Sequence, residues 1–235
     1  MTDIYLDTAN LDEIEEIWQW GIIRGITTNQ KIFLKEKGCD FEDRAIEILK
    51  MVKPYPVSIE GPNDPSDLIA EATKYQYWGD NVVVKVPMLV DGDGIVANNA
   101  LLKHGIKTNV TACITLNQVF LAACSGATYV SLFYNRMKDY WKELEEVFQK
   151  EGETTCISPT DYALNTIKES VKLLENYDTR LIIGSIREPE DIEEILSVKP
   201  DIITIPYKIL KQMPYNEKTK ETLEEFEKAW EKFNE

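Results

Sequence analysis

A single lysine interrupts an otherwise apolar stretch at Val82–Pro87, and its setting suits covalent chemistry. The stretch is rich in β-branched residues, which is typical of a parallel strand covered on both faces. Alternation places Lys85 on one face with Val83 and Pro87. Burial disfavours the ammonium form of a lysine, and the neutral amine can attack a carbonyl to form a Schiff base. The alternative is an edge strand on which Lys85 points to water.

Schiff-base aldol chemistry also needs groups that move protons and hold hydroxyls. A carbinolamine must lose water, and cleavage of a carbon–carbon bond removes a proton from a hydroxyl, so a carboxylate is required. Glu60 lies at the end of the preceding strand, and Asp7 lies at the end of the first one. Asn29 and Asn109, also at strand ends, can hold substrate hydroxyls without adding charge.

Two arginines and a serine follow later strands and could bind a phosphate. Arg136 and Arg187 lie just beyond two predicted strands, and Ser185 precedes the second arginine. Guanidinium groups suit phosphate monoesters because they donate paired hydrogen bonds. The alternative is that each arginine forms a surface ion pair with one of the abundant carboxylates.

The elements that would position these residues alternate between short apolar strands and amphipathic helices. The predicted strands are Ile4–Thr8, Gly25–Asn29, Pro56–Glu60, Val82–Pro87, Lys107–Thr111, Tyr129–Phe133, Leu181–Ser185 and Ile202–Pro206. The predicted helices are Leu11–Trp20, Phe41–Val52, Pro65–Tyr77, Ile95–Lys103, Thr115–Ser125, Asp161–Glu175 and Pro189–Val198. About eight such units without a linker predict a single-domain α/β protein, a (β/α)8 TIM barrel over residues 1–235. The main rival, an open doubly wound sheet, lacks a glycine-rich turn after the first strand.

Two segments are additional to the strands and helices of a minimal barrel. Tyr140–Lys150 is an additional charged amphipathic stretch after the sixth strand. Residues 217–235 form a predicted C-terminal helix, with Leu223, Phe226 and Trp230 among its apolar residues at helical spacing. That stripe could pack on its own barrel or dock on a neighbouring subunit.

The amino-acid composition restricts the binding partners and the cellular compartment that we expect for this protein. The chain has 235 residues and a formal net charge of −15, which argues against nucleic acids and anionic membranes as partners. An acidic protein that binds an anionic substrate must gather a few positive groups locally. The four cysteines show no metal-ligand spacing and are predicted to be small buried residues in a reduced cytoplasm. We therefore expect a cytoplasmic protein with no metal and no cofactor.

Several motifs, in order along the chain, resemble one known family. They are Leu6-Asp7-Thr8-Ala9-Asn10, Gly25-Ile26-Thr27-Thr28-Asn29, Val83-Val84-Lys85-Val86-Pro87-Met88, Gly105-Ile106-Lys107-Thr108-Asn109-Val110-Thr111, Gly126-Ala127-Thr128-Tyr129-Val130-Ser131 and Gly184-Ser185-Ile186-Arg187. The chain resembles the small transaldolases and the fructose-6-phosphate aldolases over nearly its whole length. The resemblance implies a (β/α)8 barrel, metal-free class I chemistry and phosphorylated sugar substrates. It also implies a homo-oligomer, a pentamer or decamer, in which C-terminal helices reach a neighbour.

The resemblance also implies roles for individual residues. Lys85 would attack the ketose phosphate, and Asp7, Glu60 and Thr111 would move protons through a bound water. Arg136, Arg187 and Ser185 would bind the phosphate. Thr27, Asn29, Asn109, Ser131 and Phe133 complete the expected substrate site.

Two of these positions separate the activities of the family. Glu60 and Phe133 stand where the aldolases carry glutamine and tyrosine, which favours a transaldolase of the pentose phosphate pathway. A fructose-6-phosphate aldolase that releases free dihydroxyacetone is the nearest alternative. A non-catalytic sugar-phosphate-binding barrel is a more distant one.

The chain also departs from the pattern of the family in several places. Gln30-Lys31 replaces the usual Pro-Ser after Asn29. The extra segment near Tyr140–Ser158 follows the sixth strand, and we expect it to cover part of the mouth of the site.

Overall fold

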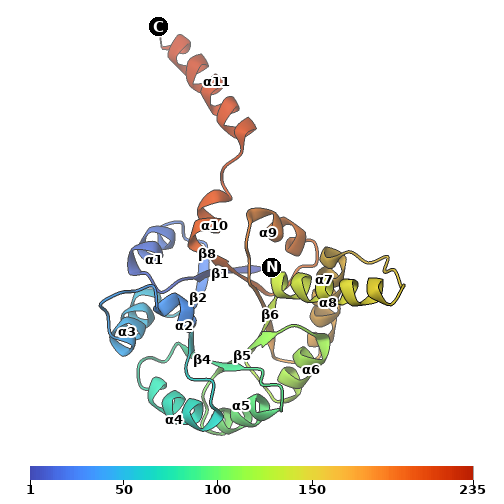
Figure 1. Cartoon of the computed structure of the whole chain (residues 1–235). Helices are drawn as coiled ribbons and strands as arrows, with labels where there is room; N and C mark the ends of the chain where they lie inside the picture. Colours follow the sequence, from blue (N-terminus) through green and yellow to red (C-terminus); the bar gives the residue numbers. More distant parts are fainter. Residues whose placement is uncertain (235) are drawn as a thin grey trace.

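A closed barrel of parallel strands forms the centre of the protein (Figure 1). The computed structural model describes residues 1–234. Over that range the strands are β1 (Asp3–Asp7), β2 (Ile23–Thr27), β3 (Val57–Glu60), β4 (Val82–Pro87), β5 (Thr108–Cys113), β6 (Tyr129–Phe133), β7 (Arg180–Gly184) and β8 (Ile202–Pro206). Each strand pairs in parallel with the next, and β8 pairs with β1 to close the ring. The predicted (β/α)8 barrel is therefore confirmed.

Helices follow the strands along the chain, and most of them lie around the outside of this ring (Figure 1). They are α1 (Leu11–Trp18), α2 (Gln30–Phe33), α3 (Phe41–Val52), α4 (Pro65–Tyr75), α5 (Asp93–Lys103), α6 (Leu116–Cys124), α7 (Tyr134–Lys150), α8 (Pro159–Leu174), α9 (Pro189–Leu196), α10 (Tyr207–Gln212) and α11 (Glu217–Phe233). The sequence pattern misses α2 and α10, because helices of four and six residues are too short to show a helical period.

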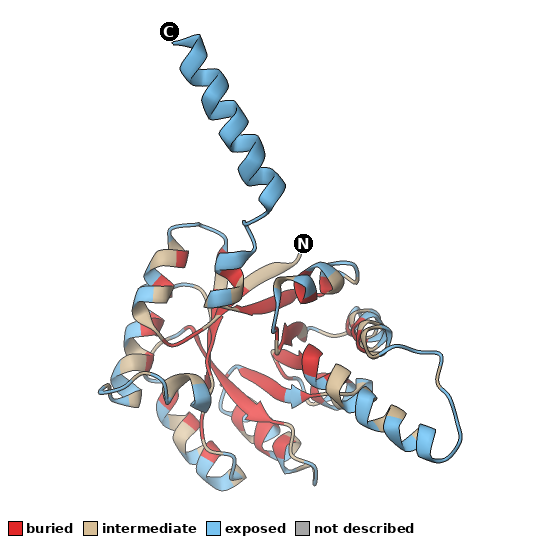
Figure 2. Ribbon diagram, turned by 45° about the horizontal axis from the view of Figure 1, so that its top comes forward, coloured by how far each residue is buried: buried red, intermediate tan, exposed pale blue. Residues whose placement is uncertain are grey.

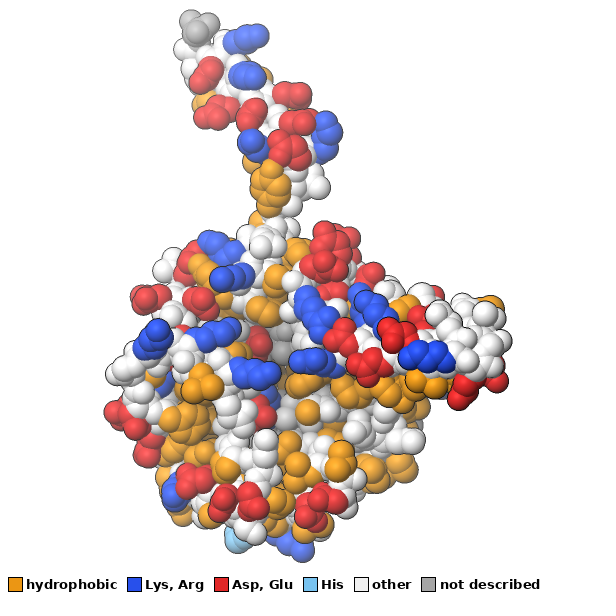
Figure 3. All heavy atoms as spheres, in the orientation of Figure 1, with side chains coloured by type: hydrophobic (Ala, Val, Ile, Leu, Met, Phe, Trp, Pro, Cys, Tyr) orange, Lys and Arg blue, Asp and Glu red, His pale blue; other side chains and the backbone are white. Residues whose placement is uncertain are grey.

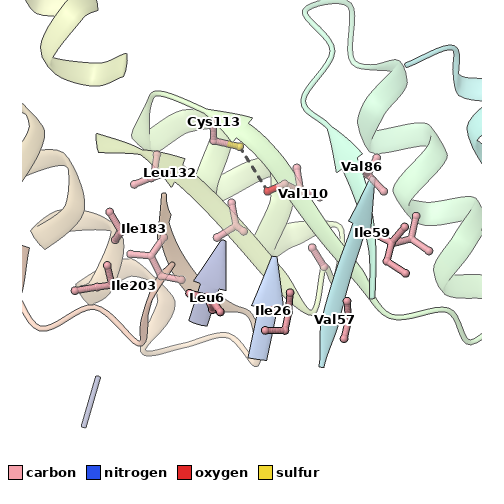
Figure 4. Packing of buried hydrophobic residues seen from close by; sticks show 14 of the residues in the cluster. Leu6, Ile26, Val57, Ile59, Val86, Val110, Cys113, Leu132, Ile183 and Ile203 are labelled. Carbon is pink, nitrogen blue, oxygen red and sulfur yellow. Dashed lines mark hydrogen bonds between the residues drawn. The ribbon is translucent and has the colours of Figure 1, made fainter. Parts of the chain in front are cut away.

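The hydrophobic core has two parts, one outside the strands and one inside the barrel. The outer part lies between strands and helices and includes strand residues drawn in Figure 4, among them Leu6, Ile26 and Val86. The inner part is the small cluster of Tyr5, Val83, Tyr129, Ile182 and Ile202. Buried residues accordingly concentrate on the strands and on the inward faces of the helices (Figure 2).

One glycine makes room for the inner cluster. A Cβ at Gly25 on β2 would lie 2.6 Å from the ring of Tyr5. The absence of a side chain at Gly25 therefore allows the Tyr5 ring to fill the interior of the barrel. The inner cluster closes the interior, so the barrel is a packed core rather than a pore.

The segment after β6 differs from its prediction. One continuous helix, α7, starts directly after the strand at Tyr134 and absorbs the stretch expected to begin at Tyr140. From its first turns α7 runs outward, and the connection to α8 lies at the periphery of the molecule (Figures 1 and 2). The structure therefore gives no support to the expectation that residues 140–158 cover the mouth of the site.

The C-terminal helix leaves the barrel altogether (Figure 1). None of the described residues of α11 is buried, and Leu223, Phe226, Trp230 and Phe233 are between 59% and 80% exposed. Packing of this stripe on its own barrel, one of the two alternatives from sequence, does not occur. The predicted helix extended to Glu235, which lies outside the described residues.

The cysteines differ in burial, contrary to the prediction that all four are buried. Cys113 is fully buried, and burial raises the pKa of its thiol to about 12. Cys39 is half-buried, whereas Cys124 and Cys156 are exposed. None of the described helices has the length and apolar composition needed to cross a membrane.

Candidate active site

Strand register brings the reactive lysine next to two of its predicted partners. Glu60 on β3 is in register with Lys85 on β4, and Lys85 is in register with Asn109 on β5. Neighbouring parallel strands lie about 4.8 Å apart, so side chains in register on the same face meet. Strand pairing therefore brings Glu60 into contact with Lys85, whereas the Asn109 amide bonds to Ser58 and Ser131.

The amine of Lys85 is buried but has polar partners. Its Nζ lies 3.0 Å from Glu60 Oε2 and donates a hydrogen bond of 2.9 Å to the carbonyl of Thr28. The Lys85 side chain is only 7% exposed, and that of Glu60 is 13% exposed. The edge-strand alternative is therefore wrong, because Lys85 faces the barrel interior. The picture of purely apolar walls is also wrong, since the amine forms a buried ion pair with a carboxylate.

The end of β4 is held in place by close packing against the start of α5. A Cβ at Gly94 would lie 2.2 Å from the carbonyl oxygen of Pro87, so any larger residue would force the two segments apart. Gly94 thus lets the chain after the lysine strand turn back tightly against the strand end.

A second carboxylate, Asp7, belongs to a short chain of hydrogen bonds. Thr27 Oγ1 donates to Asp7 Oδ1 at 2.6 Å and lies 2.5 Å from Thr204 Oγ1, which therefore donates to Thr27. Burial raises the pKa of Asp7 above its ordinary value. The bond from Thr27 and the positive charge of Lys85 lower that pKa, but burial outweighs them. A carboxyl group with a raised pKa is suited to exchange protons near neutral pH.

Thr111 on β5 presents a hydroxyl to the same region. Its side chain is 1% exposed, and its Oγ1 has no hydrogen-bond partner among residues 1–234. Leaving a buried hydroxyl unbonded is costly, so this group is available to a water or a substrate oxygen.

Asn109 does not line the cavity itself but contacts a residue that does. Its Nδ2 donates to Ser58 Oγ at 3.3 Å, and its Oδ1 accepts a bond of 2.8 Å from Ser131 Oγ. The amide thereby fixes the Ser131 hydroxyl, which does reach the cavity. The side chain of Asn29 already has a backbone partner. Its Oδ1 accepts a hydrogen bond of 3.0 Å from the N–H of Ile32 and thereby caps α2.

Most of the predicted site residues line one cavity of about 250 Å³ at the carboxyl ends of the strands. The lining comprises Asp7, Thr27, Asn29, Lys31, Lys85, Thr111, Ser131, Phe133, Arg136, Gly184, Ser185 and Thr204. Glu60 is absent from this lining, but it contacts Lys85 directly. This face carries the active site in enzymes with this architecture.

The two predicted phosphate-binding arginines occupy different surroundings. Arg136 lines the cavity, whereas Arg187 lines an adjoining space of about 450 Å³ that also contains Asp7 and Lys35. Arg187 donates two hydrogen bonds to Asp139, at 3.0 and 2.5 Å, and this pairing raises its pKa. Arg136 lies 3.8 Å from the same carboxylate. Both arginines thus form a surface ion pair with Asp139, close for Arg187 and looser for Arg136.

The loop that carries Ser185 is held in an unusual backbone conformation. Ser185 has φ of +64°, a left-handed value that is unfavourable for a residue other than glycine. Asn135 Nδ2 donates to the Ser185 carbonyl at 2.8 Å and to Asp191 Oδ2 at 2.6 Å. The same Asp191 carboxylate accepts the backbone N–H of Arg187 at 2.8 Å. Two buried side chains therefore hold the serine against the cavity.

Sequence reasoning missed five residues of this region. Asn135 and Asp191 position the Ser185 loop, Asp139 pairs with Arg187, Thr204 bonds to Thr27, and Lys31 lines the cavity. Thr204 could have been found, since it alternates with Ile203 and Ile205 and therefore faces the interior. The other four depend on tertiary contacts that spacing does not reveal.

Potential metal-ligating side chains are dispersed over the described part of the chain. No three histidine, cysteine, aspartate or glutamate side chains gather there in a way that could hold an ion. The polar groups around Lys85 are instead hydroxyls, amides, carboxylates and basic side chains. Such a set can bind a hydroxylated, anionic molecule and exchange protons with it.

Comparison with known proteins agrees with this arrangement. Residues 4–235 match the family described as Transaldolase/Fructose-6-phosphate aldolase. A probable transaldolase of Thermoanaerobacter sp. (strain X514) is 38% identical over 231 residues, covering 97% of this chain and 96% of the relative. Probable transaldolases of Caldicellulosiruptor saccharolyticus and Nitrosopumilus maritimus are 37% and 36% identical over 233 residues. These cover 97% of this chain, and 97% and 95% of the relatives. The chain belongs to the transaldolase/fructose-6-phosphate aldolase family.

Proposed function

We propose that the protein is a transaldolase that moves a dihydroxyacetone unit from a ketose phosphate to an aldose phosphate through a Schiff base on Lys85. The observation that carries this proposal is the buried amine of Lys85, 3.0 Å from Glu60, in a cavity that also contains Asp7. Sedoheptulose 7-phosphate and fructose 6-phosphate are the proposed donors. Such a reaction would serve the pentose phosphate pathway in the cytoplasm.

The first half of the reaction forms the covalent intermediate. Lys85 Nζ transfers a proton to Glu60 and attacks the ketone carbon of the donor, giving a carbinolamine. Glu60 returns a proton to the carbinolamine hydroxyl, which leaves as water while a carbon–nitrogen double bond forms. The free hydroxyl of Thr111 holds the water involved in these transfers.

The second half breaks and remakes a carbon–carbon bond. Asp7 takes the proton from the donor hydroxyl on C4, the bond between C3 and C4 breaks, and an aldose phosphate leaves. The electron pair of that bond stays on the lysine-bound three-carbon unit as an enamine. This enamine attacks the aldehyde of the second aldose, and Asp7 returns the proton to the new hydroxyl. Water then releases the ketose product from Lys85.

Phe133 supports transfer rather than release of the three-carbon unit. It lines the cavity and carries no hydroxyl, so it cannot protonate the enamine carbon. An enamine that is not protonated waits for an acceptor aldehyde. A fructose-6-phosphate aldolase, which would release free dihydroxyacetone, remains the alternative.

Two measurements test this proposal. Borohydride reduction in the presence of fructose 6-phosphate should trap a three-carbon adduct, and mass mapping should place it on Lys85. The Lys85→Met variant, with circular dichroism confirming its fold, should show no adduct and no turnover. A Lys85→Met protein with full turnover would refute the mechanism.

The acceptor requirement separates the two activities. A transaldolase consumes fructose 6-phosphate continuously only when an aldose phosphate such as erythrose 4-phosphate is present. Sustained release of dihydroxyacetone without an acceptor would identify an aldolase instead. No covalent adduct and no turnover under either condition would point to a non-catalytic sugar-phosphate-binding barrel.

We also propose that the protein works as a homo-oligomer, a pentamer or decamer. The exposed stripe of Leu223, Phe226, Trp230 and Phe233 on α11 supports this, because a helix that leaves its own barrel needs another surface to cover its apolar side chains.

A further inference from the structure

Lys31 is a basic residue of the catalytic cavity that the sequence analysis did not assign to the site. It is the second residue of α2, the helix that Asn29 caps. It lines the cavity together with Lys85, Arg136 and Ser185. Its position follows from the short α2 turn, which places Lys31 at the mouth of the barrel.

The charges around the cavity give Lys31 a particular importance. Asp139 neutralises Arg187 through two hydrogen bonds and also lies 3.8 Å from Arg136. The ammonium of Lys85 is paired with Glu60. Lys31, by contrast, is exposed and has neither an ion pair nor a side-chain hydrogen bond within residues 1–234. No neighbouring carboxylate therefore pairs with it, and its side chain lines the cavity.

The surface view agrees with a local concentration of positive charge. Lysine and arginine side chains gather around a hollow near the middle of the face shown in Figure 3. Elsewhere the chain is strongly acidic, with a formal net charge of −15. An anionic substrate therefore meets its main attraction at this mouth.

We propose that Lys31 supplies, with Arg136, a positive charge that binds the substrate phosphate in this cavity. This inference deepens the proposed function and rests on it for the identity of the substrate. The anion-binding property itself rests on the cavity alone.

Physical arguments favour this assignment over a solvated surface lysine. Lys31 and Arg136 line a single cavity of about 250 Å³, so an anion inside it lies within the roughly 8 Å over which charges act at physiological salt. A phosphate monoester carries close to two negative charges, which one loosely held guanidinium does not balance. The flexible lysine stem can bring a compact charge to the phosphate oxygens without a fixed geometry.

The test compares Lys31→Met with a matched control. Lys37 is exposed in the same segment and lines none of the described cavities, so Lys37→Met removes an equal charge away from the site. Binding of inorganic phosphate is measured by isothermal titration calorimetry at low ionic strength. Lys31→Met should raise the Kd by roughly fivefold to tenfold, as expected for one charge-assisted contact. Lys37→Met should match the parent protein, and Lys31→Arg should retain most of the affinity.

A kinetic comparison adds a ratio of KM values that would not change if Lys31 had only a structural role. Lys31→Met should raise the ratio of the KM for fructose 6-phosphate to that for unphosphorylated fructose by a similar factor. Equal phosphate affinity in Lys31→Met and the parent would overturn the inference. Equal weakening in Lys37→Met would overturn it too, because the effect would then reflect overall charge.

The experiment also separates failure of this inference from failure of the proposed function. Phosphate binding requires no turnover, so it reports on Lys31 even in a protein without aldol activity. Absence of a borohydride adduct on Lys85, together with phosphate binding that Lys31→Met weakens, would reject the proposed function and support the anion site.

Discussion

The hydroxyl of Thr27 donates a 2.6 Å hydrogen bond to Asp7, although the two residues lie on different strands. The bond stabilises the ionised carboxylate and so lowers the pKa of Asp7, which burial raises. Thr27 thus moderates the proton affinity of the group that we propose as the acid–base catalyst. Thr204 in turn orients the Thr27 hydroxyl.

Removing this hydrogen bond should shift the pH profile. In Thr27→Val the pKa of Asp7 rises further, because the ionised form loses its donor while burial remains. The acid limb of the kcat/KM profile should therefore move to higher pH, with a loss of roughly tenfold at the acid end. Thr27→Ser keeps the donor and should behave like the parent. An unchanged acid limb in Thr27→Val would exclude Asp7 as the titrating base.

Asp7 should also reduce stability at high pH. Its pKa is raised in the folded chain, so between the unfolded and folded values the folded state binds more protons. Stability is therefore lost as pH rises through that window, and the penalty is complete above the folded pKa. Asp7→Asn should raise the free energy of unfolding by on the order of 1 kcal/mol at pH 8 and by less at pH 4. Urea unfolding at both values measures this.

The same variant should lose activity while it gains stability. Without the carboxylate, kcat should fall roughly 10²-fold to 10⁴-fold, the range for loss of a general acid–base group. Opposite changes in stability and turnover are expected at a buried functional carboxylate. An Asp7→Asn protein that is less stable at pH 8 than the parent would contradict the burial argument.

Asp139→Asn should release Arg187 from its ion pair. The side chains of both residues are partly exposed, so unfolding stability should change by less than about 1 kcal/mol. The mouth gains one net positive charge, and the KM for fructose 6-phosphate should fall about twofold to fivefold at low salt. Added salt should reduce the gain. A KM that rises would show that Asp139 holds Arg187 in its working position.

Removal of α11 tests the proposed assembly. A chain ending before Glu217 loses the stripe of Leu223, Phe226, Trp230 and Phe233 but no buried residue among those described. It should keep its fold by circular dichroism, while light scattering shows a smaller assembly. As a control that keeps the helix, exposed Lys228→Ala should leave the mass unchanged. An unchanged mass after truncation would remove α11 from the interface.

The barrel was predictable because its strands are short, β-branched and regularly spaced. The bounds of β4, β6 and β8 match the prediction, and β4 and β8 end at a proline, which marks the boundary in the sequence. The continuous α7 was not foreseen, because Tyr134-Asn135-Arg136 follows the strand without a capping residue or a break.

The site was predictable where strand ends alone determine position. Asp7, Lys85 and Thr111 share one cavity because their strands are parallel and their side chains face inward. The sequence predicted that Glu60 lies near Lys85, but it did not predict their ion pair. The alternation of side chains along a strand gives the face of a residue and not its distance from a neighbour. The pairing of Arg187 with Asp139 depends on α7 meeting the loop after β7, a contact between segments far apart in sequence.

The placement of Lys85 within a closed ring has a consequence for its chemical exposure. Strand pairing on both sides fixes its neighbours Glu60 and Asn109, and no edge exists from which the ladder could fray. Loop motions can widen the entrance, but the amine turns outward only if the whole ring opens. Amine-acylating reagents too large for the cavity should therefore spare this lysine for as long as the native state persists.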